Sequence, residues 1–165
     1  EKMIVDLRDN PGGLLDSVCD VLRKILPEGL IVYTEDKDGN REEEKCDGKN
    51  ELRIPLAVLV NESSASASEI FAGAVQDYGI GTIVGTTTYG KGVVQSIRQL
   101  SDGSAIKLTV ANYYTPKGNN INKTGIKPDI EVSQDTSLLN KNKDEITHDE
   151  DNQLQEAIKA VEKEK

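Results

Sequence analysis

The apolar residues of this chain follow two periodicities that together predict alternating strands and helices. Short apolar or alternating runs predict strands at residues 3–7, 30–34, 41–46, 54–60, 82–85, 93–100 and 105–110. Apolar positions at helical spacing predict helices over residues 15–25, from the serine cluster to residue 78, and around 154–161. The run 54–60 (Ile-Pro-Leu-Ala-Val-Leu-Val) is apolar throughout, which is typical of a parallel strand covered on both faces.

Turn residues between these runs indicate how the strands connect. Asp38-Gly39 separates two strand patterns, and Ser101-Asp-Gly-Ser104 separates two more, so each pair predicts a β-hairpin. Strand and helix alternate in the first half of the chain, whereas hairpins dominate the second half. The fold class predicted from this order is α/β or α+β, built around one mixed sheet.

The 165 residues fit one domain, and the net charge of −9 lies mainly in two segments. Residues 35–47 and 133–165 each carry an excess of acidic side chains, while the body shows no basic stripe, so nucleic acid is not an expected partner. No apolar run reaches the length of about eighteen residues that a membrane span needs, and the first residues do not resemble a signal peptide. They resemble the middle of a strand, which suggests that the chain is cut from a longer protein.

The two cysteines, Cys19 and Cys46, lack metal-ligand spacing. Cys19 lies in a helical pattern and is expected to be a small buried residue. A disulfide between them and the redox compartment are left open by the sequence.

One glycine-rich segment matches a phosphate-binding loop only in part. Residues 85–92 (Gly-Thr-Thr-Thr-Tyr-Gly-Lys-Gly) fit the pattern up to Lys91, but Gly92 stands where a magnesium-binding hydroxyl is required. The β-branched residues that follow predict a strand, whereas a phosphate loop needs a helix there. We therefore reject nucleotide binding, and Lys91 is left without a role from this motif.

The segment Ser63-Ser-Ala-Ser-Ala-Ser-Glu-Ile70 places four hydroxyls at the start of a predicted helix. Ser66 and Glu69 have the spacing of a capping box, which explains them structurally. A serine between a buried strand and a helix N-terminus is also well placed to act as a nucleophile, because the backbone amide after it can stabilise an oxyanion. Both interpretations stay open for Ser66 from its local sequence.

A nucleophilic serine needs a base, and the single histidine, His148, lies in a charged segment expected to be exposed. A lysine is the alternative, provided that apolar burial lowers its pKa by up to about 3–5 units. Lys91 has the most apolar local sequence of the lysines, although an exposed loop lysine is the commoner case.

Five ordered segments resemble the carboxyl-terminal processing, or tail-specific, serine proteases. They are residues 6–13 (Asp-Leu-Arg-Asp-Asn-Pro-Gly-Gly), 64–70, 85–95, 113–118 (Tyr-Tyr-Thr-Pro-Lys-Gly) and 125–129 (Gly-Ile-Lys-Pro-Asp). The resemblance implies a ClpP/crotonase-like core with β-hairpins and flanking helices. It also implies a serine endopeptidase that cleaves protein substrates near their C-termini without a metal or an organic cofactor.

The same resemblance implies roles for individual residues. Ser66 would be the nucleophile and Lys91 the general base, with Gln95 orienting the lysine. The backbone N–H groups of Gly12 and Ala67 would form the oxyanion hole.

Residues 1–132 would then be part of a protease core, and residues 133–165 a polar linker and a C-terminal helix. Family members also carry a PDZ domain and earlier core strands, which this chain lacks, so the chain alone is expected to have little activity and to associate into a homo-oligomer. The expected partners are C-terminal segments of polypeptide substrates and the PDZ domain of the parent, and the expected location is extracytoplasmic. The alternative is a non-catalytic binding or scaffold module on the same fold.

Overall fold

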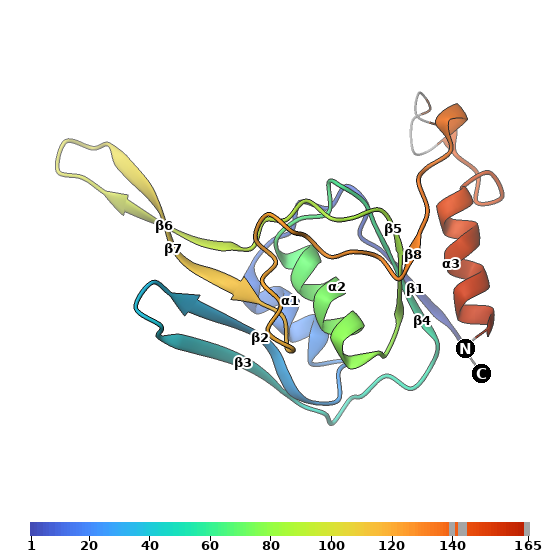
Figure 1. The fold of residues 1–165 in the computed structure, drawn as a ribbon, viewed down its shortest axis with the longest axis horizontal. Helices are drawn as coiled ribbons and strands as arrows, with labels where there is room; N and C mark the ends of the chain where they lie inside the picture. The colour runs from blue at the N-terminus through green and yellow to red at the C-terminus, as the bar shows by residue number, and fades with distance from the viewer. Residues whose placement is uncertain (139–140, 142–144, 164–165) are drawn as a thin grey trace.

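The computed structural model describes residues 1–138, 141 and 145–163 of the chain (Figure 1). Its strands are β1 (Met3–Asp6), β2 (Glu28–Asp36), β3 (Arg41–Asp47), β4 (Leu56–Val60), β5 (Thr82–Gly85), β6 (Val93–Gln99), β7 (Ala105–Tyr114) and β8 (Ile130–Glu131). Its helices are α1 (Leu15–Leu22), α2 (Ala67–Tyr78), the 3₁₀ helix η1 (Thr136–Leu138) and α3 (Asn152–Lys163). The predicted strands and helices are all present, with ends that differ by a few residues.

The strands form two four-stranded sheets instead of the single mixed sheet that the sequence predicts. One sheet has the order β1-β4-β5-β8, and each of its neighbouring pairs is parallel. The other has the order β3-β2-β7-β6, and each of its pairs is antiparallel. The separation follows from the connections, because hairpins join antiparallel strands while the parallel strands are reached by crossovers.

Strand β4 is buried along its whole length, as its unbroken apolar sequence predicts. Leu56, Val58 and Val60 belong to the large core that includes α1 and α2. Ala57 and Leu59 point the other way, into a smaller cluster with residues of α3. Because side chains alternate along a strand, one strand supplies both cores.

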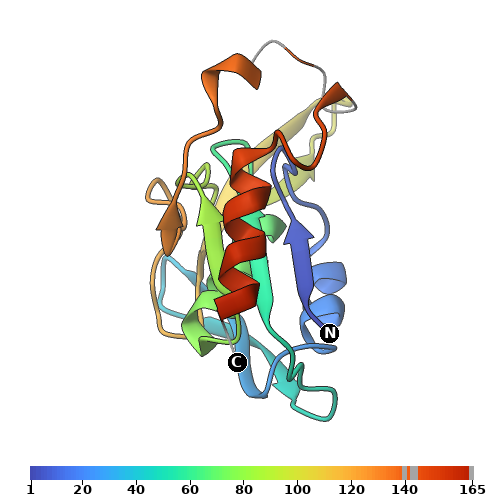
Figure 2. The same cartoon turned by 90° about the vertical axis from the view of Figure 1, so that its right-hand side faces the viewer.

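Helix α3 covers the outer face of the parallel sheet (Figure 2). Ala157, Ala160 and Val161 pack against Ala57, Leu59 and Val84 of the sheet. The segment that the sequence predicts as a linker and a helix therefore contributes to the fold through this helix. Residues 139–140 and 142–144 of the predicted linker lie outside the described residues.

The β6–β7 hairpin extends away from the body of the molecule (Figure 1, yellow). It carries several exposed apolar side chains, namely Ile97, Leu100, Ile106, Leu108 and Val110. The hairpin begins directly after Lys91, so the candidate base lies where the hairpin meets the core.

Both cysteines are buried and free. Burial raises the pKa of the Cys19 thiol to about 11, so this thiol is protonated at neutral pH. Cys46 donates a weak hydrogen bond to the carbonyl oxygen of Leu26 at 3.4 Å. The expectation that Cys19 is a small buried residue is confirmed.

Candidate functional site

Ser66 occupies a strained turn between β4 and α2. Its backbone has φ 57° and ψ −114°, a conformation that non-glycine residues rarely adopt. Strain of this kind costs about 1–3 kcal/mol and is concentrated at functional sites. The side chain is half-buried, whereas the strand before it and the helix after it are buried.

The hydroxyls of Ser64 and Ser68 make structural hydrogen bonds that distinguish these residues from Ser66. The Ser64 hydroxyl donates to the carbonyl oxygen of Leu7 at 2.7 Å, and it accepts the backbone N–H of Asn61 at 2.9 Å. The Ser68 hydroxyl donates to the carbonyl oxygen of Asn10 at 3.0 Å. Both of these side chains are buried, whereas Ser63 is exposed and Ser66 is half-buried at the start of the helix.

The buried Glu69 carboxylate joins the Ser66 turn to the Lys91 loop. Its Oε2 atom accepts the backbone N–H of Ser66 at 2.9 Å and the backbone N–H of Lys91 at 2.8 Å. The backbone nitrogens of the two residues therefore lie within hydrogen-bond distance of one atom. Glu69 has no solvent exposure, so these charge-assisted bonds are little weakened by water.

The second Glu69 oxygen holds the loop that leads to Lys91. Its Oε1 atom accepts the Thr88 hydroxyl at 2.6 Å and the backbone N–H of Gly90 at 2.7 Å. Thr88 in turn accepts the backbone N–H of Ile126 at 2.7 Å. The motifs around residues 66 and 88 therefore meet at one carboxylate, and the motif around residue 126 joins them through Thr88.

Lys91 and Gln95 project from the surface. Both side chains are exposed, so the apolar burial that a lysine base requires is not found in this chain. Within the described residues, neither side chain has a hydrogen-bond or ion-pair partner, and Gln95 is not bonded to Lys91. The fold brings the backbone of Lys91 to the Ser66 turn and leaves its amine in solvent.

Gly12 packs directly against the Ser66 turn. Its φ is +98°, and a Cβ atom there would lie 2.6 Å from the carbonyl oxygen of Ala65 and 2.8 Å from the nitrogen of Ala67. Only glycine tolerates both the conformation and the contact. The carbonyl oxygen of Asn10 accepts the backbone N–H of Ala65 at 3.0 Å, which fixes the two loops together.

The two predicted oxyanion-hole amides are therefore adjacent but not equivalent. Ala67 is the first residue of α2, so its N–H has no acceptor within the helix. The Gly12 N–H donates to the side-chain oxygen of Asn10 at 2.9 Å. An oxyanion at this position would either share the Gly12 N–H with the Asn10 side-chain oxygen or displace that oxygen from it.

A cavity of about 270 Å³ opens beside these two amides. It is lined by Gly12 and Ala67 together with apolar side chains, among them Val5, Leu7, Leu14, Val18 and Phe71. An apolar cavity next to paired N–H groups has the character of a site for the side chain of a bound peptide.

Glu69 and Thr88 hold the loop that leads to Lys91, a role that was not predicted from the sequence. Glu69 had a signal as the third residue of a capping box, and its bond to Ser66 confirms that part. Its bonds to residues 88, 90 and 91 join parts of the chain about twenty residues apart, which spacing within a helix cannot indicate.

Two absences hold for the described residues. They contain no group of three or more His, Cys, Asp or Glu side chains placed to hold a metal ion. No described helix is long and apolar enough to cross a membrane.

The sequence is similar to those of known carboxyl-terminal processing proteases. It is 51% identical over 131 residues to the carboxyl-terminal-processing protease of a Synechocystis species, covering 79% of this chain and 31% of that protein. It is 43% identical over 131 residues to the chloroplastic C-terminal processing peptidase of Tetradesmus obliquus, covering 79% of this chain and 28% of that protein. The chain thus spans about a third of the length of these curated relatives.

The fold leads to the same family. A solved structure of a photosystem II D1 C-terminal processing protease superposes with a TM-score of 0.76 and 42% sequence identity, covering 80% of this chain and 34% of that one. The model of peptidase family S41 matches residues 1–132. The chain therefore belongs to peptidase family S41, as part of the protease core of a homologue of the serine-type carboxyl-terminal processing proteases.

Proposed function

We propose that this chain carries the catalytic residues of an endopeptidase that cleaves polypeptides near their C-termini, with Ser66 as nucleophile and Lys91 as general base. The observation that carries the proposal is the Glu69 oxygen that accepts the backbone N–H of both residues. Half-burial of Ser66, its strained backbone and the apolar cavity beside it support the same assignment. The membership in a protease family supplies the reaction type.

In the proposed reaction, the Ser66 hydroxyl oxygen attacks the scissile carbonyl carbon while the neutral Lys91 amine takes its proton. The carbonyl oxygen becomes an oxyanion, which the N–H groups of Gly12 and Ala67 stabilise by hydrogen bonds. The C–N bond then breaks, and Lys91 returns the proton to the departing amine. A water molecule, activated by the same lysine, hydrolyses the acyl-enzyme and restores the Ser66 hydroxyl.

The proposal requires that Lys91 be neutral for part of the cycle. A protonated amine has no free electron pair and cannot accept the proton of the Ser66 hydroxyl. Because Lys91 is exposed in this chain, we propose that the bound substrate and further parts of the whole protein cover it. The same covering would bring Gln95 into contact with the lysine and allow it to orient the amine.

The activity of the whole protein depends on more than these residues. Since the chain spans about a third of its relatives, we propose that a PDZ domain of the parent presents the substrate tail and that this chain alone has little activity. An extracytoplasmic location is part of the proposal, and one of the relatives is chloroplastic. The alternative, a binding module without catalysis, is disfavoured because the strained Ser66 turn and its link to Lys91 have no evident use in a scaffold.

Substitution of either dyad residue tests the catalytic assignment. In the protein at its full natural length, Ser66→Ala and Lys91→Ala should each lower the rate of peptide cleavage at least about a thousandfold. Gln95→Ala should lower it less, because Gln95 acts only through the lysine. A serine-directed probe should label Ser66 in the parent protein. Retained turnover in Ser66→Ala or Lys91→Ala contradicts the assignment, and an unchanged rate in Gln95→Ala removes its orienting role.

Gly12 and Gly13 are adjacent in the loop that would supply one oxyanion-hole N–H, so they offer a matched pair of substitutions. A methyl group at Gly12 would collide with the backbone on both sides of Ser66, whereas Gly13 has open space and no unusual φ. Gly12→Ala should therefore reduce kcat about a hundredfold or more, and Gly13→Ala should change it by less than about threefold. Equal kcat values for the two variants, measured on the same peptide, would show that Gly12 does not contact the reacting oxygen.

Glu69→Ala tests whether one carboxylate holds both loops. The variant leaves three backbone N–H groups and the Thr88 hydroxyl without their acceptor. Leaving a single buried donor unsatisfied costs about 1–3 kcal/mol, so denaturant unfolding should show a loss of about 3 kcal/mol or more. Glu62→Ala is the control, because Glu62 is exposed and, among the described residues, bonds the Thr86 hydroxyl alone. A loss of less than about 1 kcal/mol for Glu69→Ala would be inconsistent with its central position.

A further inference from the structure

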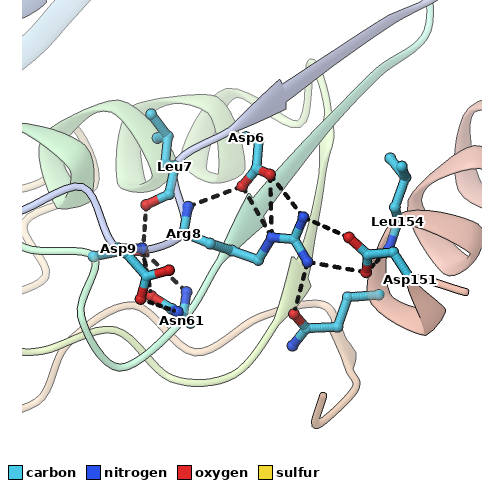
Figure 3. Close-up of polar contacts among 9 residues, drawn as sticks. Asp6, Leu7, Arg8, Asp9, Asn61, Asp151 and Leu154 are labelled. Carbon is cyan, nitrogen blue, oxygen red and sulfur yellow. Dashed lines mark hydrogen bonds and ion pairs between the residues drawn. The ribbon is translucent and has the colours of Figure 1, made fainter. Parts of the chain in front are cut away.

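The guanidinium of Arg8 bonds side chains from two elements, strand β1 and the start of helix α3 (Figure 3). Two of its nitrogens donate to the two oxygens of Asp151, at 3.0 and 2.8 Å, in a bidentate arrangement. It also donates to Asp6 at 2.7 Å and to the side-chain oxygen of Gln153 at 3.1 Å. Arg8 follows strand β1, whereas Asp151 and Gln153 belong to the start of α3, 143 or more residues later.

The Arg8–Asp151 pair is largely shielded from solvent. The two side chains retain 12% and 11% of their exposure, so their attraction is screened less than that of a surface pair. Burial raises the pKa of Asp151, but the hydrogen bonds from Arg8 and from the backbone N–H of Leu154 outweigh it, and the pKa lies below its usual value. The pair is therefore ionised at neutral pH.

The Asp151 side chain is held in place by the start of helix α3. Its Oδ1 atom accepts the backbone N–H of Leu154 at 3.0 Å, which caps the first turn of α3. Gln153 donates to the carbonyl oxygen of Val132 at 2.7 Å, next to β8. The packing of α3 on the parallel sheet then ties Asp151 to the core.

The chain from Arg8 to Gly12 has a second attachment on the nucleophile side. Asp9, with φ 58°, exchanges two hydrogen bonds of 2.9 Å with the Asn61 side chain, which follows β4. Asn10 accepts the backbone N–H of Ala65. The loop that carries Gly12 is thus held by Asn61 and Ala65 on one side, and by Asp151 through Arg8 on another. Figure 3 shows Asn61 and Asp151 on opposite sides of Arg8.

The role of Asp151 differs from that of Asp6, the other carboxylate on Arg8. Asp6 is the last residue of β1, only two residues before Arg8, so it neutralises the guanidinium without fixing it to another part of the fold. Asp151 and Gln153, by contrast, belong to a separate element at the start of α3. A contact with a distant element restricts the position of the loop that follows Arg8, whereas a contact between residues two apart in sequence does not.

We propose that Asp151 is a positioning residue that acts through Arg8 to hold the oxyanion loop, residues 9–13, against the Ser66 turn. Asp151 lies beyond residues 1–132, the part of the chain that the family model matches. The C-terminal helix would thus set the geometry of a catalytic element at the other end of the sequence. The catalytic part of this inference rests on the proposed function, while the positioning part concerns the loop itself.

The test compares Asp151→Asn with Asn152→Ala. Asp151→Asn keeps the side-chain shape and an acceptor for the Leu154 N–H, but it removes the negative charge that forms the ion pair with Arg8. Asn152→Ala weakens the same helix start, because Asn152 bonds Ser133 and Asp135, and it does not touch Arg8. Asp151→Glu, which restores a carboxylate, measures rescue.

The first readout is hydrogen exchange of the backbone amides of Asp9, Asn10, Gly12 and Gly13 in the protein at its full natural length, since Pro11 has no N–H. We expect these amides to exchange at least about tenfold faster in Asp151→Asn, to remain near the wild-type rate in Asn152→Ala, and to recover in part in Asp151→Glu. The amides of α2 should change little in all three variants. Exchange in residues 9–13 that rises no more in Asp151→Asn than in Asn152→Ala overturns the inference.

The second readout is peptide cleavage, measured well below the unfolding temperature of each variant. We expect kcat to fall about tenfold or more in Asp151→Asn with KM changed less than about threefold, since the oxyanion forms only after binding. Asn152→Ala should keep the wild-type kcat. An unchanged kcat in Asp151→Asn overturns the catalytic part of the inference. Absence of Ser66-dependent cleavage in the wild type overturns the proposed function instead, and hydrogen exchange still decides the positioning of the loop.

Discussion

The bonds to the Glu69 carboxylate are the interaction on which the rest of this site depends. A buried carboxylate is expensive unless hydrogen bonds satisfy it, and here four donors from two loops do so. The same bonds fix the backbone of Ser66 relative to that of Lys91. The capping residue Glu69 thereby links the backbones of the proposed nucleophile and the proposed base.

The fold supports this link by burying the parallel sheet on both faces. Strand β4, packed between the α1–α2 layer and α3, delivers the Ser66 turn from a rigid position. Strand β1 runs parallel beside β4 and delivers the Gly12 loop to the same edge. The carboxyl ends of neighbouring parallel strands meet at one edge of a sheet, which explains why two segments more than fifty residues apart form one site.

The sequence predicted what depends on neighbouring residues and missed what depends on distant ones. The apolar run of β4, the hairpin turns and the cap formed by Ser66 and Glu69 are local patterns, and the structure contains each of them. The division into two sheets, the reach of Glu69 to Lys91 and the Arg8–Asp151 pair arise only when the chain folds. Lys91 has apolar neighbours in sequence, but side chains adjacent in sequence at the base of a projecting hairpin do not cover it, and the lysine is exposed.

The most direct measurement is the distance between the Lys91 Nζ atom and the Ser66 Oγ atom in a crystal structure of the full-length protein with a peptide bound. Since Glu69 brings the two backbones together, we expect the side chains to close to hydrogen-bond distance, about 2.6–3.2 Å, once the peptide covers the lysine. A separation well beyond that range, with the peptide carbonyl at the amides of Gly12 and Ala67, would contradict the Ser-Lys assignment.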